Sequence, residues 1–469
     1  MAALVTVLAG CGNTYRPVVT AINPVGPAGQ PQKYAVAISN PNLTTPSSCP
    51  ATIPSGSAPG LISIVDFSGD SLLVNANVGV DPYYFQISSG GNTGYTLNSD
   101  QTVTSFDISS SLMTNQVLQS TLINTPPPCS NSVFPEGAYT YITEPGHNAV
   151  AVLTGTPGVL QEELAIPSGF TPVYIAGVAG APRAYAITPS TSASSNGQVS
   201  AIENISLPTV SNLIPVGVNP VYGVMTSDYR RAFILNKGGS SVSVINAQTN
   251  ALDTFSISGS TTPTSTITLV SGAQPLWADF APTLNELAVA SAGPTTNSNG
   301  TLSLISIPIC SATALPTNPN CDPNNPVDAA GFGTILQTVP VGVNPVMVSV
   351  LQDGTFAFVA NAGNPNLPCA ATPVAGVSTA CSVSVVNLTT NTVVATLPSL
   401  PDAQCSTATA LTVCGHPSYI VATTGTPTGK VYVVSSDSKF LSVIRTDTDA
   451  VQAVIPLQGN GVSVRVTLP

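Results

Sequence analysis

The 469 residues contain few side chains of the kinds that carry out acid, base or nucleophilic chemistry. Only two histidines occur, and His147 follows a Pro-Gly pair while His416 precedes a proline, so we expect both to lie in turns rather than to act as catalytic bases. The motifs of serine hydrolases, zinc peptidases, P-loop proteins and dinucleotide-binding enzymes do not occur in a fitting context. We therefore predict no catalytic residue, no bound metal and no cofactor.

Acidic residues are spread along the chain instead of converging on one segment. Those considered for a role are Glu136, Glu144, Glu162, Glu163, Asp279, Glu286, Asp353 and Asp402. Most of them fall in predicted turns. Asp279 differs, because it follows Trp277 by two positions on a predicted strand and could face the interior as a ligand or ion contact.

A set of large side chains recurs two positions after a proline. Successive segments place Tyr84, Tyr174, Tyr222, Trp277, Met347 and Tyr419 at this position. Aromatic rings with a polar tip are suited to stacking against sugars or peptide groups. We therefore take Tyr84, Tyr174, Tyr222, Trp277, Asp279 and Tyr419 as candidate ligand-binding residues. The alternative is that these rings wedge neighbouring structural units together.

The prolines belong to a pattern that repeats along the chain. The segment VGVNPVYGVMTSDYRRAFILN at Pro220 returns as VGVNPVMVSVLQDGTFAFVAN at Pro345, and similar segments surround Pro275 and Pro417. Each unit holds four short runs of β-branched and aromatic residues between turn-forming residues, which predicts four strands. Weaker copies bring the number of units to eight. Four antiparallel strands per repeat are typical of a β-propeller blade.

The repeats predict an all-β fold, a single closed β-propeller with eight four-stranded antiparallel blades, or seven as the alternative. The segment 462–468 alternates strictly between apolar and polar residues, so we expect this C-terminal strand to join the first blade and close the ring. We assign residues 31–469 to the propeller, 12–30 to a tether and the start of the first blade, and 1–11 to a signal segment.

The repeat units resemble a known family. The V-G-x-x-P segment, the strands AFILN, AFVAN and VYVVS, and the strands VSVIN, VSVVN and LSVIR are similar to the YVTN-type β-propeller repeat. The resemblance covers nearly the whole chain after residue 30. It implies a secreted or surface-attached bacterial or archaeal protein. Because relatives of that fold include lactonases, the resemblance leaves an enzyme and a binding module both open.

The N-terminal residues resemble the processing site of a bacterial lipoprotein. An apolar run ends in Leu8-Ala9-Gly10-Cys11, which predicts a signal peptide and lipidation of Cys11. The protein would then be held at the cell envelope by acyl chains, periplasmic or surface-exposed, with no other membrane contact. No Lys or Arg precedes the run, so we expect translation to begin upstream of Met1. A chance match in an alanine-rich start is the alternative.

The eight remaining cysteines fit a disulfide framework better than a metal site. Six occur in close pairs, namely Cys310 with Cys321, Cys369 with Cys381, and Cys405 with Cys414, which leaves Cys49 and Cys129. The chain contains no CxxC spacing. Disulfides in these loops would be preserved in an oxidising compartment.

Charge and loop lengths favour a binding function. A net charge of −11 argues against nucleic acid as a partner. Long insertions are expected at 40–60, 123–132, 188–197, 258–274, 291–300, 361–381 and 398–416 on one face of the ring, and at 308–333 on the other. We predict a monomeric scaffold that binds an envelope protein, peptide or glycan through the loop-rich face. The alternatives are a lactonase-like hydrolase with a channel site, and loops that have drifted without function.

Overall fold

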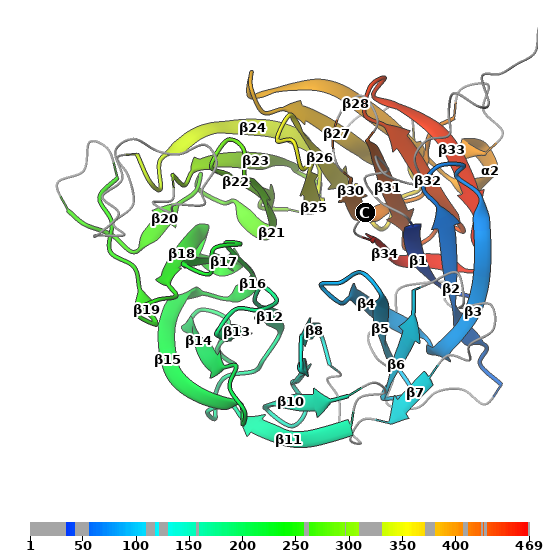
Figure 1. The fold of residues 1–469 in the computed structure, drawn as a ribbon. Coiled ribbons are helices and arrows are strands. Elements are labelled where there is room, and N and C mark those ends of the chain that lie inside the picture. Colours follow the sequence, from blue (N-terminus) through cyan, green and yellow to red (C-terminus); the bar gives the residue numbers. More distant parts are fainter. Residues whose placement is uncertain are drawn as a thin grey trace, which may run out of the picture.

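Eight antiparallel sheets surround a central axis in the computed structural model (Figure 1). The structure describes residues 34–42, 56–108, 118–121, 130–155, 159–257, 262–295, 297–308, 331–370, 380–406, 411–423, 425 and 429–467. Each sheet is a blade, and consecutive blades follow one another around the ring. The predicted eight-bladed propeller is confirmed, and the alternative with seven blades is excluded.

The first four blades begin beside the point where the ring closes. Blade 1 comprises β34 (Asn460–Val466), β1 (Tyr34–Asn40), β2 (Pro59–Asp66) and β3 (Leu72–Val80), and blade 2 comprises β4 (Pro82–Ile87), β5 (Thr93–Asn98), β6 (Thr102–Asp107) and β7 (Leu118–Thr121). Blade 3 comprises β8 (Val133–Glu136), β9 (Tyr139–Glu144), β10 (Ala149–Thr154) and β11 (Val159–Ala165), and blade 4 comprises β12 (Tyr174–Ala176), β13 (Arg183–Thr188), β14 (Asn196–Glu203) and β15 (Thr209–Val218).

The other four blades follow the same order from the inner to the outer strand. Blade 5 comprises β16 (Pro220–Met225), β17 (Arg231–Asn236), β18 (Ser241–Asn246), β19 (Ala251–Leu252) and β20 (Thr266–Thr268), and blade 6 comprises β21 (Gln274–Ala281), β22 (Glu286–Ala292), β23 (Asn299–Ser306) and β24 (Ile335–Val343). Blade 7 comprises β25 (Pro345–Val350), β26 (Phe356–Asn361), β27 (Ser382–Asn387), β28 (Thr392–Leu400) and β29 (Val413–Cys414), and blade 8 comprises β30 (Pro417–Ala422), β31 (Lys430–Ser435), β32 (Phe440–Arg445) and β33 (Ala450–Pro456).

The C-terminal strand closes the ring, as the alternating segment predicts. Strand β34 pairs antiparallel with β1, with Val36 opposite Arg465, and the Tyr34 N–H donates to the Thr467 hydroxyl at 3.0 Å. The two ends of the propeller thus share one sheet. This pairing satisfies an edge that would otherwise offer unpaired N–H and C=O groups to another chain.

Two blades depart from four antiparallel strands. In blade 5 the outer position is divided between β19 and β20, which both pair with β18. In blade 7 the short strand β29 runs parallel to β28, with Ser399 opposite Val413. The short helix α2 (Asp402–Cys405) precedes β29, and the bond between Cys405 and Cys414 holds this excursion against the blade.

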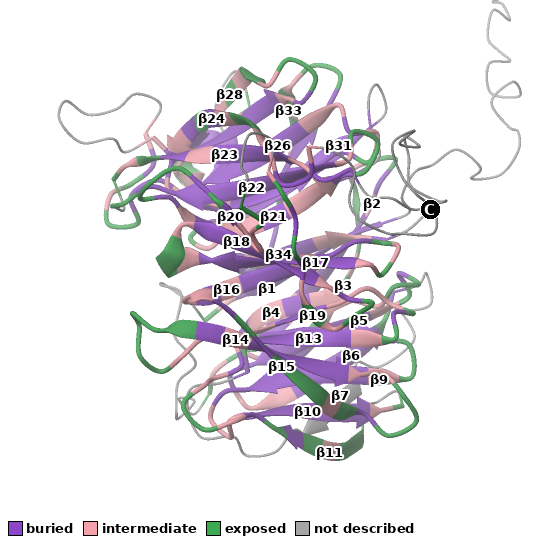
Figure 2. Ribbon diagram, turned by 90° about the vertical axis from the view of Figure 1, so that its left-hand side faces the viewer, coloured by how far each residue is buried: buried purple, intermediate pink, exposed green. Residues whose placement is uncertain are grey.

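The middle strands form the core because both of their faces pack against neighbouring blades. Residues 232–235 of β17 and 431–434 of β31 are almost fully buried, whereas β11 is largely exposed (Figure 2). Strands that are covered on both faces are expected to be continuously apolar. The runs AFILN and VYVVS have this composition for that reason.

Packing between neighbouring blades explains the glycine and the asparagine that recur in the repeat units. A side chain at Gly217 would meet the Asn236 amide, because a Cβ built there lies 2.6 Å from the Asn236 Cγ. The Asn236 Nδ2 in turn donates to the Ser243 hydroxyl at 3.0 Å. Gly342 and Asn361 repeat this contact in blade 7. The glycine of V-G-x-x-P is therefore required so that the asparagine at the end of the second strand of the following blade can reach its partners.

Candidate functional site in the central channel

The inner strands bring most of the candidate aromatic residues together. Tyr222 of β16 stacks on Trp277 of β21, with ring centroids 4.1 Å apart and planes inclined by 25°. The ring centroids of Tyr174 and Tyr222 are 4.6 Å apart, and Tyr419 packs edge-on against Trp277 with ring centroids 5.8 Å apart. These four residues come from blades 4, 5, 6 and 8, so we call them the aromatic cluster. They contact one another across the channel, in addition to packing between neighbouring blades.

A basic residue lies beside the aromatic cluster. The Arg465 guanidinium is 4.6 Å from the centroid of the Tyr419 ring, a cation–π distance. Burial raises the pKa of Tyr419 to about 12, although the charge of Arg465 opposes this rise. Arg465 is not among the candidate residues predicted from the sequence. Its signal is a single cation within the otherwise uncharged segment VSVRVTL, on the strand that closes the ring.

A cavity of about 650 Å³ extends from the aromatic cluster along the inner strands. Tyr222 and Trp277 lie at one end of it, and its walls include Asp279, Met347, Ser349 and Ile420. The lining continues to the turns that follow β16 and β21, at positions 226–228 and 285. Because every inner strand begins at the loop-rich face, these turns lie at the opposite face. The cavity is therefore on the far side of the aromatic cluster from the loop-rich face, and its lining includes Ile307, which precedes the 308–333 connection of the opposite face.

Asp279 lines the cavity and also joins two blades. Its Oδ2 accepts a hydrogen bond from the Val350 N–H at 2.8 Å, and its Oδ1 accepts one from the Phe280 N–H at 2.9 Å. Burial raises the pKa of Asp279 to about 6, and the two N–H donors and Arg465 limit that rise. The carboxylate is thus held in a fixed orientation with part of its surface toward the cavity.

Three polar atoms of the cavity lack hydrogen-bond partners. Within the described part of the chain, the Asp228 Oδ2, the Glu286 Oε2 and the Arg465 Nε are buried and have no such partner. The Asp228 Oδ2 lies 3.9 Å from the Arg230 Nε, so its charge is paired. Burial raises the pKa of Glu286 above its ordinary value. Buried polar atoms are normally satisfied by protein, water or ligand. The Glu286 and Arg465 atoms therefore offer one acceptor and one donor to a molecule in the cavity.

Tyr84, the remaining aromatic candidate, lies on β4 of blade 2. Its ring packs against the hydrophobic cluster formed by blades 2 and 3. It is close enough to influence the pKa of Tyr174 and of Tyr419. Met347, at the equivalent position in blade 7, is buried and lines the cavity.

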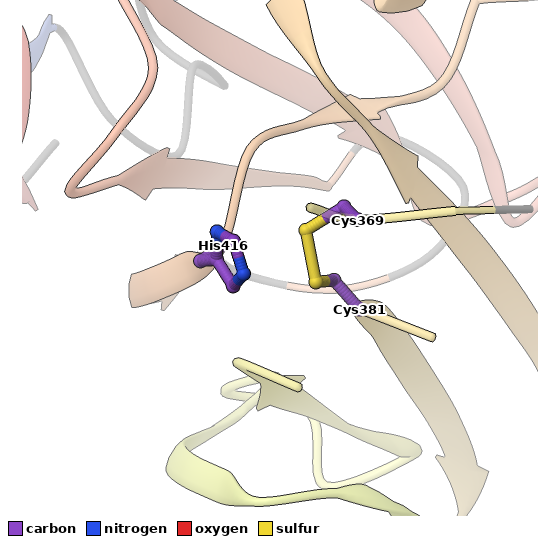
Figure 3. Close-up of side chains that lie close together, drawn as sticks. All are labelled: Cys369, Cys381 and His416. Carbon is purple, nitrogen blue, oxygen red and sulfur yellow. A yellow bond between two sulfur atoms is a disulfide. The ribbon is translucent and has the colours of Figure 1, made fainter. Parts of the chain in front are cut away.

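The loop-rich face is held together near blades 7 and 8 by His416, by the disulfide of Cys369 and Cys381 beside it (Figure 3), and by a second disulfide. The His416 Nδ1 lies 2.6 Å from the Asp437 Oδ2, and the Nε2 lies 2.9 Å from the Leu367 carbonyl oxygen. Since a carboxylate and a carbonyl can only accept, both ring nitrogens donate and the ring is an imidazolium. The hydrogen bond to Asp437 raises the pKa of His416 accordingly. This histidine has a structural role.

Two of the expected disulfides are confirmed. Cys369 bonds to Cys381, and Cys405 bonds to Cys414. The other cysteines, namely Cys11, Cys49, Cys129, Cys310 and Cys321, lie outside the described residues, as does the segment 1–33. Parts of the predicted insertions 40–60, 123–132, 258–274, 291–300, 308–333, 361–381 and 398–416 also lie outside them. The strand bounds place these insertions in the predicted type of connection, except for 258–274. That segment contains β20, so it begins within the divided outer strand of blade 5 instead of after it.

The described residues contain no helix that is long and apolar enough to span a membrane.

Comparison with known proteins supports the fold. No family model and no curated protein matches the chain. Among solved structures, the chain is similar to dihydro-heme d1 dehydrogenase NirN in complex with DHE (TM-score 0.55, 11% identity, 93% of this chain and 75% of that one). It is also similar to apo AztD from Citrobacter koseri (0.53, 9%, 92% and 97%) and to a putative 6-phosphogluconolactonase from Bacteroides fragilis (0.51, 11%, 94% and 99%). At these identities the similarity establishes the β-propeller fold alone.

Proposed function

We propose that this protein is a binding propeller, and that its channel cavity holds a small polar ligand such as a glycan or peptide segment. The observation that carries the proposal is the cavity of about 650 Å³, with Tyr222 and Trp277 at its inner end. Ligand sites in proteins are clefts of about 300–1,000 Å³ that combine apolar walls with a few fixed polar groups. The cavity has both properties.

The polar groups of the cavity define the ligand. Asp228, Asp279 and Glu286 outnumber the single Arg465 in the lining, so the cavity favours a neutral or cationic ligand over an anion. The free Glu286 Oε2 accepts a hydrogen bond from a ligand hydroxyl or amine, and the free Arg465 Nε–H donates one to a ligand oxygen. Sugars and peptides supply such groups together with flat apolar surfaces for the aromatic rings.

The proposal includes the family and the location. We place the chain among the YVTN-type repeat proteins because the V-G-x-x-P glycine and the Y-V-x-N asparagine make the repeated packing contact described above. We place it in the cell envelope, as a monomer anchored through a lipid on Cys11. Disulfides persist in oxidising compartments, so the two bonds in the loops of blades 7 and 8 support this location.

A lactonase-like hydrolase with a channel site is the second candidate, favoured by the pKa of about 6 at Asp279. Two observations weaken this candidate. Both carboxylate oxygens of Asp279 already accept N–H donors, and neither His147 nor His416 lines the cavity. Hydrolysis of a neutral lactone by wild type and by D279N separates the two functions. If the protein only binds ligands, neither wild type nor D279N should hydrolyse the lactone faster than buffer alone does.

Binding can be followed at a single site because Trp277 is the only tryptophan in the chain. We expect a neutral oligosaccharide or a short cationic peptide from a defined panel to change the emission of Trp277 and to reduce its quenching by acrylamide. The variant R465Q should bind the same ligand about 10-fold more weakly or worse, since a charge-assisted hydrogen bond contributes about 1.5–3 kcal/mol.

The matched control is R445Q, because Arg445 pairs with Asp447 on the surface of blade 8, outside the cavity. This variant should bind the ligand as wild type does. Equal weakening by both changes, or a fluorescence that no compound of either class alters, would overturn the proposed site.

A further inference from the structure

Blade 3 carries a second polar cluster that lies outside the channel. Glu144 ends β9, His147 lies in the turn between β9 and β10, and Glu163 lies near the end of β11. In the sheet register Glu144 is opposite Ala149, and Glu163 is opposite Ala151, on the two sides of β10. Because side chains alternate along a strand, both glutamates project from the same face of the sheet. The residues between them on β10, Ala149 and Ala151, carry small side chains.

The three side chains present their polar atoms to one another. The His147 Nδ1 lies 3.9 Å from the Glu144 Oε2 and 3.4 Å from the Glu163 Oε1. One ligand atom from each residue lies within 4.8 Å of the other two. An ion bound at about 2.0–2.2 Å from each needs them roughly 3–4 Å apart, so shifts of about half an ångström complete the geometry.

An independent observation points to a missing ligand at this cluster. Glu144 is fully buried, and neither of its carboxylate oxygens has a hydrogen-bond partner among the described residues. The His147 Nδ1 is likewise buried without one. A buried carboxylate is costly unless it is hydrogen-bonded, paired with a cation or coordinated to a metal. A cation held between the three residues would satisfy all of these atoms at once.

We propose that Glu144, His147 and Glu163 form a binding site for a divalent transition-metal ion. One imidazole and two carboxylates match the preferences of Zn²⁺ and Mn²⁺, whereas a site for Ca²⁺ consists of oxygen ligands alone. The side chains of His147 and Glu163 are 26% and 37% exposed, so the ion has a route in from solvent. Three protein ligands leave at least one coordination position for water or for an oxygen of another molecule.

The neighbouring Glu162 supplies a control of the same chemistry. It is opposite Val152 in the register, whereas Glu163 is opposite Ala151, so its side chain lies on the other face of the sheet. Glu162 lies close to Tyr141. The pKa of Tyr141 is raised mainly by burial of its ring and by the charge of Glu136, and to a smaller extent by the charge of Glu162. The same strand therefore carries one carboxylate that belongs to the cluster and one that does not.

The site can be tested by calorimetric titration of the full chain after treatment with EDTA and dialysis. We expect wild type to bind one equivalent of Zn²⁺ or Mn²⁺, and to bind Ca²⁺ at least about 10-fold more weakly. E144Q and H147Q should each weaken binding by about 100-fold or more, since loss of a group that merely supports a ligand costs about 10–100-fold. E162Q should bind as wild type does.

A second measurement guards against misfolding of a variant. Saturating Zn²⁺ should raise the Tm of wild type and of E162Q, and should leave the Tm of E144Q and H147Q unchanged, because an ion stabilises only a protein that binds it when folded. The proposal is overturned if wild type binds neither Zn²⁺ nor Mn²⁺. It is also overturned if E144Q and H147Q retain the stoichiometry and affinity of wild type.

Discussion

The two histidines of this chain occupy corners of the propeller that look alike in sequence and differ in structure. His416 lies beside the disulfide of Cys369 and Cys381 (Figure 3). Each of its ring nitrogens has a partner, the Asp437 carboxylate for one and two backbone carbonyl oxygens for the other. His147 faces two glutamates, one of them buried, and its Nδ1 has no hydrogen-bond partner among the described residues. The ring nitrogens of His416 are both hydrogen-bonded, whereas the group around His147 contains buried polar atoms without hydrogen-bond partners among the described residues.

This difference shows that the partners of a polar group are more informative than its residue type or the length of its loop. The loop-rich corner of blades 7 and 8 has the features usually linked to binding, yet its histidine and its cysteines already hold the loops together. The cavity lies toward the opposite face and the blade 3 cluster lies beside a short turn, and both contain buried polar atoms without hydrogen-bond partners among the described residues. We therefore expect binding at the latter two sites and structural effects at the former.

The largest change in the free energy of unfolding is expected from loss of the disulfide beside His416. Changing both Cys369 and Cys381 to Ala should lower the free energy of unfolding by about 3 kcal/mol, because a loop of this length then gains entropy in the unfolded chain. Denaturant unfolding measures the loss. Zinc binding should be unaffected, and its disappearance from a folded double variant would show that the two corners are not independent.

A smaller loss is expected for H416Q. The glutamine removes a charged donor from Asp437, so the free energy of unfolding should fall by about 1–2 kcal/mol at pH 6. The comparison is H147Q in metal-free buffer, which should change the same quantity by less than about 0.5 kcal/mol. Equal loss of unfolding free energy in H416Q and H147Q would mean that His147 stabilises the metal-free protein as much as His416 does.

The contribution of His416 should depend on pH. Its hydrogen bond to Asp437 raises the pKa of His416, so the stabilisation is complete below the unfolded value of about 6.5 and is lost as pH rises through the folded value. The hydrogen bonds to His416 lower the pKa of Asp437 despite its partial burial, so its share is present above about 3.9 and is lost as pH falls through the folded value.

The difference in unfolding free energy between wild type and H416Q should therefore be greatest between about pH 4 and 6.5 and should shrink at alkaline pH. Urea titrations at pH 5.5 and pH 9.5 provide the measurement. A difference that is constant over this range would mean that His416 is not an imidazolium in the folded protein.

The smallest effect is expected from E144Q in the absence of metal. Replacing a buried carboxylate that lacks donors by a neutral amide should leave the free energy of unfolding unchanged or increase it by up to about 1 kcal/mol. Urea unfolding in the presence of EDTA tests this, with E162Q as the control. A loss of more than about 2 kcal/mol would indicate that Glu144 already has a strong partner.

Most of the fold follows from local sequence, because each blade is a four-strand unit that recurs with its own turns. The VSVRV alternation likewise predicts the closing strand. The divided outer strand of blade 5 could not be predicted, since Ala251–Ile257 has the composition of one continuous strand and the pairing of β20 with β18 spans a long loop. The parallel strand β29 escaped prediction because only two residues form it.

The sites were harder to predict than the fold because they depend on contacts between blades or across a strand. The aromatic positions could be identified from the repeat, whereas the approach of Arg465 to Tyr419 requires the ring to be closed. Glu144 and Glu163 are separated by a whole hairpin, and only the register across β10 shows that they share a face. The expectation of no metal site rested on short-range spacing, which carries no information about such a pair.

The measurement that tests the central claim most directly is the Zn²⁺-to-protein ratio of wild type, H147Q and H416Q after dialysis against the same dilute zinc buffer. We predict a ratio of about one for wild type and for H416Q, and about zero for H147Q, because only His147 belongs to a group of three ligands that is free to bind an ion. A ratio that is the same in all three proteins, or that falls in H416Q instead, would contradict the account.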